Sequence, residues 1–326
     1  MVTTNTLPGN LLVHTPTMDD LEAVFALIHA TDLADDGMPD HTLDELRTYW
    51  QSPDLNLATD AWTVVTPDGQ LVGYADSEYE GYGKIFSFMR VLPAYRERGI
   101  EARLLQLVQE RALQRLSEVP VDTRVALYNW FSHADKTMVP LLEQEGFKYA
   151  RSFWRMERVM DKAPQVPEWP AGITVRTLVA GKEERAVFEM FEEAFQDHWG
   201  HTPTNFEQWV RWRLNAESFD PTLWFLAFAG DELIGASVCR YERDLDLGWV
   251  GQLAVLRPWR RKGLAMALLL HSFAEFYRRG IYKVGLGVDS QNLTGATRLY
   301  ERAGMHVALQ HDTYEKELRP GKEAGT

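Results

Sequence analysis

Cysteine is almost absent from this chain, and so are the features of membrane and secreted proteins. Cys239 is the one cysteine among 326 residues, so neither a disulfide framework nor a cysteine-based zinc site forms within one chain. No apolar run approaches the roughly 18 residues that cross a bilayer. The first ten residues show no basic start followed by an apolar core. We therefore expect a cytoplasmic protein that has no membrane partner.

An excess of positive charge is also missing. The chain has 34 Lys and Arg against 47 Asp and Glu, a formal net charge of −13. Nucleic acids and anionic membranes bind net basic surfaces, so both are excluded as partners. The acidity mildly favours a cationic small substrate. The chain likewise has no Walker A loop and no G-x-G-x-x-G dinucleotide loop.

The chain repeats itself at the scale of a whole domain. "MRVLPAYRERGIEARLLQLV" resembles "LAVLRPWRRKGLAMALLLHS", so that Arg96 and Gly99 correspond to Arg260 and Gly263 at one offset of 164 residues. "LLEQEGFKYA" likewise resembles "LYERAGMHVA". The stretch 160–172 is rich in proline and is typical of a linker. We expect one domain over 11–159, a Pro-rich linker over 160–172 and a second domain over 173–320.

The second copy has a readable order of helices and strands. Periodicity predicts helices at about 182–195, from 205 and from about 263, then a short helix closed by Gly304. Strands are predicted at 223–229, 232–242, 247–256 and 281–288, with two more at 305–310 and 313–318. This order predicts an α/β fold of the α+β kind, a mostly antiparallel mixed sheet flanked by helices.

The stretch "LRPWRRKGLAMALLLH" places three cations and a glycine directly before an apolar helix. The first amides of a helix have no partners within it, and Gly263 lets the backbone approach a ligand closely. Arg260, Arg261 and Lys262 surround those amides with positive charge. The pattern predicts a cradle for a phosphate or pyrophosphate. A helix start with surface cations is the alternative.

Two motifs in order resemble those of the GCN5-related N-acetyltransferase (GNAT) family. Arg260, Gly263 and Ala265 fill the family's acyl-CoA signature, Arg/Gln-x-x-Gly-x-Gly/Ala. The following helix matches Asn-x-x-Ala-x-x-Leu-Tyr-x-x-x-Gly-Phe, with Met in place of Phe, at Asn292, Ala296, Leu299, Tyr300, Gly304 and Met305. Two such domains in one chain resemble the tandem members of the family, which include mycothiol synthase.

The resemblance implies an acetyl-CoA-dependent N-acetyltransferase acting on a small amine. It implies that pantetheine lies along the strand near Leu253 and Val255. Asn292 and the loop from Arg260 through Arg261, Lys262, Gly263 and Leu264 to Ala265 would bind the rest of the cofactor. It further implies that an amine attacks the thioester directly, and that Tyr300 gives a proton to the departing thiolate. A half-buried helix tyrosine is the alternative for Tyr300.

The first copy departs from both motifs. Glu101 stands where the second copy has Ala265, and a carboxylate there opposes a pyrophosphate unless it turns away into solvent. Leu142 and Ala134 stand where Tyr300 and Asn292 are expected. We therefore expect the first domain to be a degenerate copy with a structural or substrate-shaping role.

The group that removes the proton of the amine is not evident. Many family members carry a Glu on the strand before the cradle, where this chain has Trp249 and Gln252. Asp246, acting through a water, is one candidate for the base, and a histidine is another. His198 and His201, with Trp249, are candidates for the acceptor pocket. Ordinary loop packing is the alternative for the two histidines, and no metal site is expected.

Two classes of function stay open at this point. One is an N-acetyltransferase, and the other is a ligand-binding or regulatory protein that kept the fold and lost the chemistry. The sequence identifies neither the acceptor nor the oligomeric state.

Overall fold

Two compact units make up the chain, and they are not consecutive in sequence. The computed structural model describes residues 6–7, 9–196, 201–292 and 295–323. Unit 1 consists of Met1–Ser152 and Leu309–Thr326, and unit 2 consists of Phe153–Ala308.

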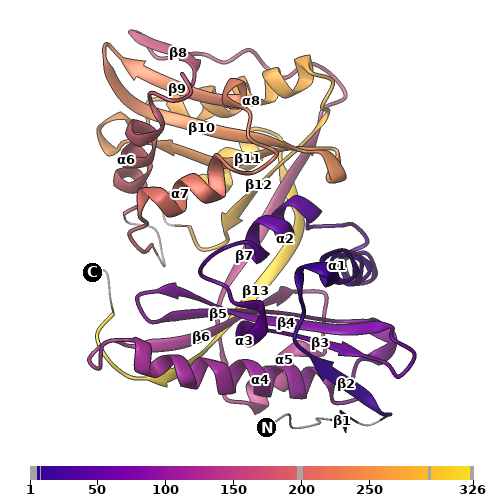
Figure 1. Ribbon diagram of the computed structural model, residues 1–326. Helices are drawn as coiled ribbons and strands as arrows, with labels where there is room; N and C mark the ends of the chain where they lie inside the picture. The colour runs from indigo at the N-terminus through magenta and orange to yellow at the C-terminus, as the bar shows by residue number, and fades with distance from the viewer. Residues whose placement is uncertain (1–5, 8, 197–200, 293–294, 324–326) are drawn as a thin grey trace. The chain divides into compact units, whose positions relative to one another are not determined.

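Unit 1 is a mixed sheet with helices on both faces (Figure 1). Its helices are α1 (Leu21–Asp36), α2 (Leu43–Trp50), α3 (Leu57–Asp60), α4 (Ile100–Arg115) and α5 (Met138–Gln144). Its strands are β1 (Thr6–Leu7), β2 (Leu11–His14), β3 (Ala61–Val65), β4 (Leu71–Gly81), β5 (Lys84–Val91) and β6 (Val125–Ser132), followed by the last strand of the chain, β13 (His306–Arg319). They lie in that order in the sheet, and β5 with β6 is the parallel pair among the described strands of this unit.

Unit 2 repeats this plan. Its helices are α6 (Glu184–Phe195), α7 (Phe206–Arg213), α8 (Leu264–Arg278) and α9 (Ala296–Arg302). Its strands, in sheet order, are β7 (Lys148–Val159), β12 (Lys283–Asp289), β11 (Leu247–Val255), β10 (Glu232–Glu242), β9 (Trp224–Ala229) and β8 (Ile173–Thr177). Here β11 and β12 form the parallel pair of the described strands. The expected mixed, mostly antiparallel sheet with flanking helices is confirmed.

The two units differ from the expected domains, because each repeat gives its last strand to the sheet of the other unit. β7 ends the first repeat, and its residues Phe153–Val159 pair with β12 of unit 2. β13 ends the second repeat and pairs with β6 of unit 1 from His311 to Arg319. β13 is also one strand where two were expected, since its ladder continues through His311 and Asp312. Hydrogen bonds between distant segments decide this exchange, and local sequence does not record it.

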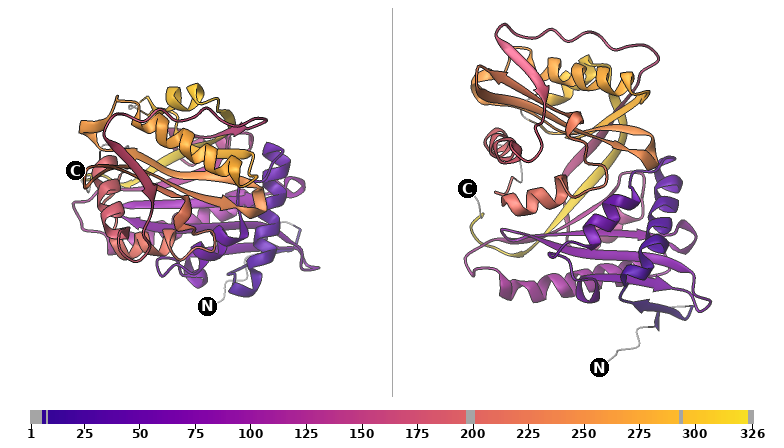
Figure 2. Two further views of the ribbon diagram at one scale, coloured as in Figure 1. Left: turned by 90° about the horizontal axis from the view of Figure 1, so that it is seen from above. Right: turned by 45° about the horizontal axis from the view of Figure 1, so that its top comes forward.

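Each face of each sheet is covered by its own set of apolar helix residues. In unit 2, α8 packs Leu268, Phe273 and Phe276 on one face, and α6 and α7 cover the other with a separate cluster. In unit 1, α4 covers one face, and α1, α2 and α3 cover the other. The left view of Figure 2 shows α8 running across the strands of unit 2, and the right view shows α4 along the sheet of unit 1.

Helix α8 packs closely enough on β11 to require a glycine there. A Cβ at Gly248 would lie 2.7 Å from ring atoms of Phe276, which is fully buried. A Cβ at Gly287, on β12, would meet only Trp249, at 3.8 Å. Among the described residues, no helix has the length and apolarity to cross a membrane.

We expect Gly248→Ala to destabilise the protein by about 1–3 kcal/mol, because the ring of Phe276 has to shift within a close-packed core. Urea unfolding measures the loss. Gly287→Ala is the matched control and is expected to stay within about 0.5 kcal/mol of the parent, as is usual for a substitution that meets ordinary contacts. Equal losses for the two variants would show that this close approach does not limit the residue at position 248.

Candidate functional site

The two parallel strands of unit 2 separate soon after they begin to pair. β11 and β12 are in register only at Gly248 with Val284 and at Trp249 with Gly285. From Val250 to Val255, the described pairing of β11 is with β10 alone. The edge of β11 that faces β12 is therefore open along this stretch, and an extended ligand can pair with its backbone there.

A β-bulge lies where the strands separate. Val238 pairs with Gln252 and Cys239 with Val250, so Gly251 is the extra residue on β11. Residues two apart on a regular strand share a face. The bulge breaks this rule, because Val250 packs with Cys239 in the α8 cluster while the partner of Gln252, Val238, packs with α6 and α7.

The loop after β11 has the backbone of an anion cradle. It continues through a short 3₁₀ turn, Arg257–Trp259, to Arg261 and Gly263, which have positive φ angles of 62° and 87°. Helix α8 begins directly after Gly263, and no described side chain caps it. The amides of its first turn have no acceptor within the helix. They point away from the helix at its positive end, as an anion requires.

Arg260 supports this loop from within. Its Nε donates to the carbonyl of Val255 at 3.0 Å, and one terminal nitrogen donates to the carbonyl of Ala194 in α6 at 2.8 Å. Arg260, the first residue of the signature, therefore links the loop to the end of β11 and to helix α6. Its expected role in binding the cofactor stays a prediction, since these two bonds use Nε and one terminal nitrogen of the guanidinium.

The other predicted cofactor residues surround the cradle. Arg261 and Lys262 are exposed, and the ammonium of Lys262 lies 4.5 Å from the centre of the Trp259 ring. Leu264 is buried under the helix, so it offers only its backbone. The remaining predicted residues are half-buried or buried in β11, in α8 and in the turn after β12: Leu253, Val255, Ala265 and Asn292.

Tyr300 belongs to the core on the α8 side of the sheet. It lies on α9, which starts after Gly295, and it is 9 % exposed among Met305, Met156 and Leu286. Burial raises the pKa of its phenol to about 12. The hydroxyl is therefore protonated at neutral pH and carries a proton that it can donate.

Trp249 lies flat against the start of β12. Its ring contacts the positions of Gly285 and Gly287, where a Cβ would lie 3.1 and 3.8 Å away. The guanidinium groups of Arg155 and Arg240 lie 6.0 and 5.9 Å from the ring centre. Arg240 pairs with Glu242, and Arg155 pairs with Glu157 at 2.6 Å. The ring of Trp249 thus lies near two arginine–glutamate ion pairs, two residues before the bulge at Gly251.

Asp246, the candidate for the base, lies in the turn that precedes β11. Asp246 does not lie on a strand, because it follows a 3₁₀ turn and has φ 46°. It is exposed and accepts a hydrogen bond from the Tyr241 hydroxyl at 2.8 Å. It precedes Gly251 by five residues, about 16 Å along an extended chain, and one bridging water does not span that distance.

The structure describes one of the two histidines of the predicted acceptor loop. His201 is half-buried, and its Nε2 lies 3.7 Å from a carboxylate oxygen of Glu192 on α6. Its role in the acceptor pocket stays a prediction. His198 lies outside the described residues. Among the described residues, no cluster of three or more His, Cys, Asp or Glu is placed to hold a metal ion.

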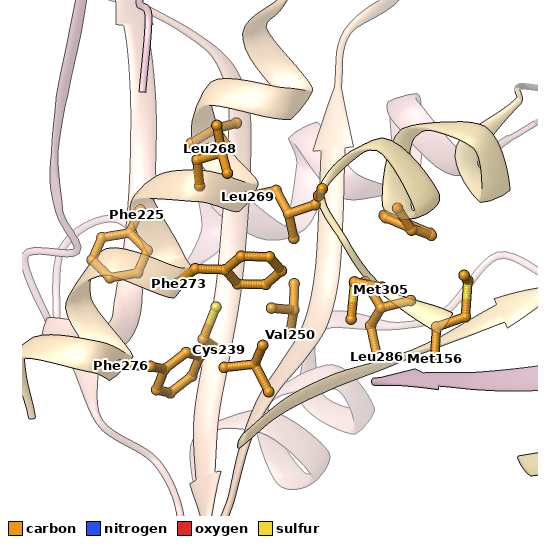
Figure 3. Packing of buried hydrophobic residues seen from close by; sticks show 14 of the residues in the cluster. Met156, Phe225, Cys239, Val250, Leu268, Leu269, Phe273, Phe276, Leu286 and Met305 are labelled. Carbon is orange, nitrogen blue, oxygen red and sulfur yellow. The ribbon is translucent and has the colours of Figure 1, made fainter. Parts of the chain in front are cut away.

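Cys239 faces the α8 core. Figure 3 shows it beside Val250, with Phe273 and Phe276 of α8 close by. Burial raises the pKa of its thiol to about 11, and Ser237 lies 3.3 Å away. The thiol is therefore neutral at ordinary pH and is not a nucleophile.

Unit 1 has the same loop with different chemistry. Arg96 donates from Nε to the Val91 carbonyl at 3.1 Å, as Arg260 does to Val255, but its terminal nitrogens bind the carboxylate of Asp35 at 2.7 and 2.6 Å. Glu101 does not turn away into solvent. It is 7 % exposed and accepts from the amide of Glu97 at 3.3 Å. A carboxylate of the chain thus lies over the amides that an anion would use.

The strands of unit 1 also stay together. β5 and β6 pair at five successive positions, from Lys84 with Ala126 to Phe88 with Trp130. The rings of Phe88 and Trp130 stack at 6.1 Å. The described register of β4 with β5 runs unbroken from Gly73 to Tyr79, so no bulge corresponds to that at Gly251.

Sequence reasoning gave Gln252 no role of its own. Its side-chain oxygen is buried and makes no hydrogen bond to the described residues. A buried carbonyl without a donor costs about 1–3 kcal/mol and calls for an explanation. The sequence contains two signals, a place where the resembling family often carries a Glu and a polar residue in an otherwise apolar strand.

Comparisons with known proteins agree with this geometry. The Acetyltransferase (GNAT) family matches residues 185–305. The mycothiol acetyltransferase of Geodermatophilus obscurus is 32 % identical over 296 residues, which are 86 % of this chain and 89 % of that protein. The crystal structure of a GCN5-related N-acetyltransferase from Sphaerobacter thermophilus superposes with a TM-score of 0.85 at 36 % identity, over 98 % of this chain and all of that one. A tandem GNAT protein from the clavulanic acid biosynthesis pathway shares the fold, with a TM-score of 0.69 at 16 % identity over 96 % of this chain and all of its own.

The contrast between Arg260 and Lys262 gives a test that needs no ligand. Arg260→Ala leaves two carbonyls without their donor, and we expect a loss of about 1–3 kcal/mol in the free energy of unfolding. Lys262→Ala removes an exposed cation and is expected to change it by less than about 0.5 kcal/mol. Urea unfolding of both variants checks this. An Arg260→Ala protein as stable as the parent would refute the supporting role.

Proposed function

The chain belongs to the GNAT acetyltransferase family and is an acyltransferase, and we propose that it transfers an acetyl group from acetyl-CoA to a primary amine of a small molecule, with the chemistry in unit 2. The observation that carries this assignment is the open edge of β11 leading to the uncapped start of α8. The open edge suits the pantetheine arm, and the helix start suits the pyrophosphate.

The residues present fit this donor. The amides from Arg261 to Ala265 bind the pyrophosphate, and the exposed Arg261 and Lys262 neutralise part of its charge. The edge of β11 at Leu253 and Val255 offers backbone groups to pantetheine. Asn292, before α9, is the further residue that we propose for binding the cofactor. Acetyl-CoA supplies an activated thioester, and the protein supplies its position and the proton.

The two faces of the sheet separate the two halves of the reaction. The amine nitrogen attacks the thioester carbon from the α6 and α7 side, the carbon–sulfur bond breaks, and the CoA thiolate leaves toward the α8 side. Tyr300 lies on that second side and donates its proton to the sulfur. The raised pKa of Tyr300 keeps the phenol loaded with this proton. The proton of the amine leaves to solvent.

Unit 1 supports this chemistry without performing it. The Glu101 carboxylate occupies the cradle, and the paired β5 and β6 close the edge that pantetheine needs. A second anion would have to displace a buried carboxylate, and a second pantetheine would have to break a parallel ladder. We infer that unit 1 binds no acyl-CoA and serves as a scaffold that completes its own sheet with β13.

The experiment that tests the assignment combines titration with an activity screen. We expect isothermal titration with acetyl-CoA to give one site per chain. Release of the CoA thiol should follow the addition of at least one amine from a panel of glucosamine, kanamycin, spermidine and alanyl-alanine. Two binding sites would contradict the closed state of unit 1. Binding without transfer to any amine of the panel would contradict the proposed acceptor class.

We expect Tyr300→Phe to lower kcat about 10²- to 10⁴-fold, the range typical of general acid catalysis. The affinity for acetyl-CoA measured by titration should not change, because the hydroxyl is proposed to act on the sulfur in the transfer step and not on the pyrophosphate. The control is Tyr277→Phe, a substitution on the α8 helix away from its N-terminal end. A Tyr300→Phe protein with the parental kcat would remove Tyr300 from the mechanism.

A further inference from the structure

The amine that attacks the thioester needs a partner on its own side of the sheet. In the resembling family that partner is often a glutamate on the strand before the cradle. Trp249 and Gln252 stand there in this chain, and Gln252 pairs with Val238, which packs in the cluster under α6 and α7. The carboxylates that flank Trp249, Glu157 and Glu242, are each paired with an arginine.

The bulge at Gly251 is what gives Gln252 this orientation. If Gly251 were a regular strand residue, Gln252 would share the face of Val250, which packs beside Cys239 (Figure 3). With the bulge, Gln252 lies opposite Val238, on the other face and on the first stretch of β11 that has separated from β12. The side chain is therefore placed where the thioester is exposed to an incoming amine.

The oxygen of Gln252 is ready to accept a hydrogen bond. It is buried, and no donor of the described residues reaches it. The position that corresponds in unit 1, at the offset of 164 residues, is Phe88, whose ring stacks on Trp130. Of these two positions, the polar side chain is in unit 2, where the parallel strands separate. In unit 1, where they stay paired, the apolar Phe88 takes the corresponding place in the sheet.

We infer that the side-chain carbonyl of Gln252 accepts a hydrogen bond from the attacking amine and positions it against the thioester, an inference that rests on the proposed transfer in unit 2. An amide carbonyl is too weak a base to remove the amine's proton. Gln252 therefore selects an amine that arrives neutral and points its lone pair at the carbonyl carbon. The rate then follows the ionisation of the acceptor itself, and no carboxylate of the site sets the pH dependence.

The first test is Gln252→Leu, assayed with acetyl-CoA and the fastest amine of the panel. We expect kcat/KM to fall about tenfold, the equivalent of one lost neutral hydrogen bond. Acetyl-CoA affinity should be unchanged. The melting temperature should stay the same or rise, because the change removes an unsatisfied buried oxygen. A structural role for Gln252 predicts the opposite, a lower melting temperature with intact activity in the folded fraction.

The second test is Gln252→Glu, which installs a carboxylate at the same distance. If this side chain touches the amine, the carboxylate takes up its proton, and the acidic limb of the pH profile of kcat/KM moves to lower pH than in the parent. Gln106→Leu, an exposed change on α4, is the matched control for both variants and should behave as the parent does.

The outcomes separate this inference from the function on which it rests. No transfer by the parent to any amine of the panel overturns the proposed function and the role of Gln252 together. Transfer by the parent that Gln252→Leu leaves at full kcat/KM, or a Gln252→Glu profile that coincides with the parental one, overturns the role of Gln252 alone.

Discussion

The separation of two parallel strands is the constraint on which the rest of unit 2 depends. β11 and β12 stay paired for two residues and then part, which leaves a row of backbone donors and acceptors open inside the domain. Such groups are costly unless something pairs with them. An extended ligand with its own amides, as proposed for pantetheine, would resolve this cost. In the proposed function, the loop at the end of β11 receives the anion, and the bulge turns Gln252 toward the acceptor.

The duplicated loop shows how one backbone serves two purposes. In both units an arginine after a 3₁₀ turn donates to the last carbonyl of the preceding strand. This shared bond fixes the loop, and the two units differ in the groups that complete it. In unit 2 the arginine also donates to the Ala194 carbonyl, and no described side chain caps the amides at the start of α8. In unit 1 Arg96 donates instead to the carboxylate of Asp35, and Glu101 accepts a hydrogen bond from the amide of Glu97 in the loop. Side chains of the protein itself thus pair with these groups. In unit 1, carboxylates of the protein occupy the place that a bound anion is proposed to take in unit 2.

Local signals in the sequence predicted most of the fold. The helices and strands of unit 2 lie close to the predicted ranges, because apolar periodicity, caps and glycines act within a few residues. The cradle was predicted from a glycine and cations before an apolar helix. The exchange of β7 and β13 was not, because it depends on pairing between segments far apart in the chain. The positive φ of Asp246, in the turn before β11, was also not predicted.

Gln252 illustrates why the least predictable features lie at the site. Its oxygen is buried without a partner among the described residues, and the glycine beside it breaks the alternation that would have hidden it against α8. Each of these features opposes stability, and a sequence selected for stability alone would place an apolar residue there, as unit 1 does with Phe88. In unit 1, strand β5 has no bulge at the corresponding place, β5 and β6 stay paired, and Glu101 binds an amide of the loop. Unit 2 keeps an open edge, uncapped amides and a side-chain carbonyl without a donor among the described residues, and the proposed acyl transfer would supply a ligand group for each. The sequence-to-structure rules fail at these positions because the partner that would satisfy them is not part of the chain.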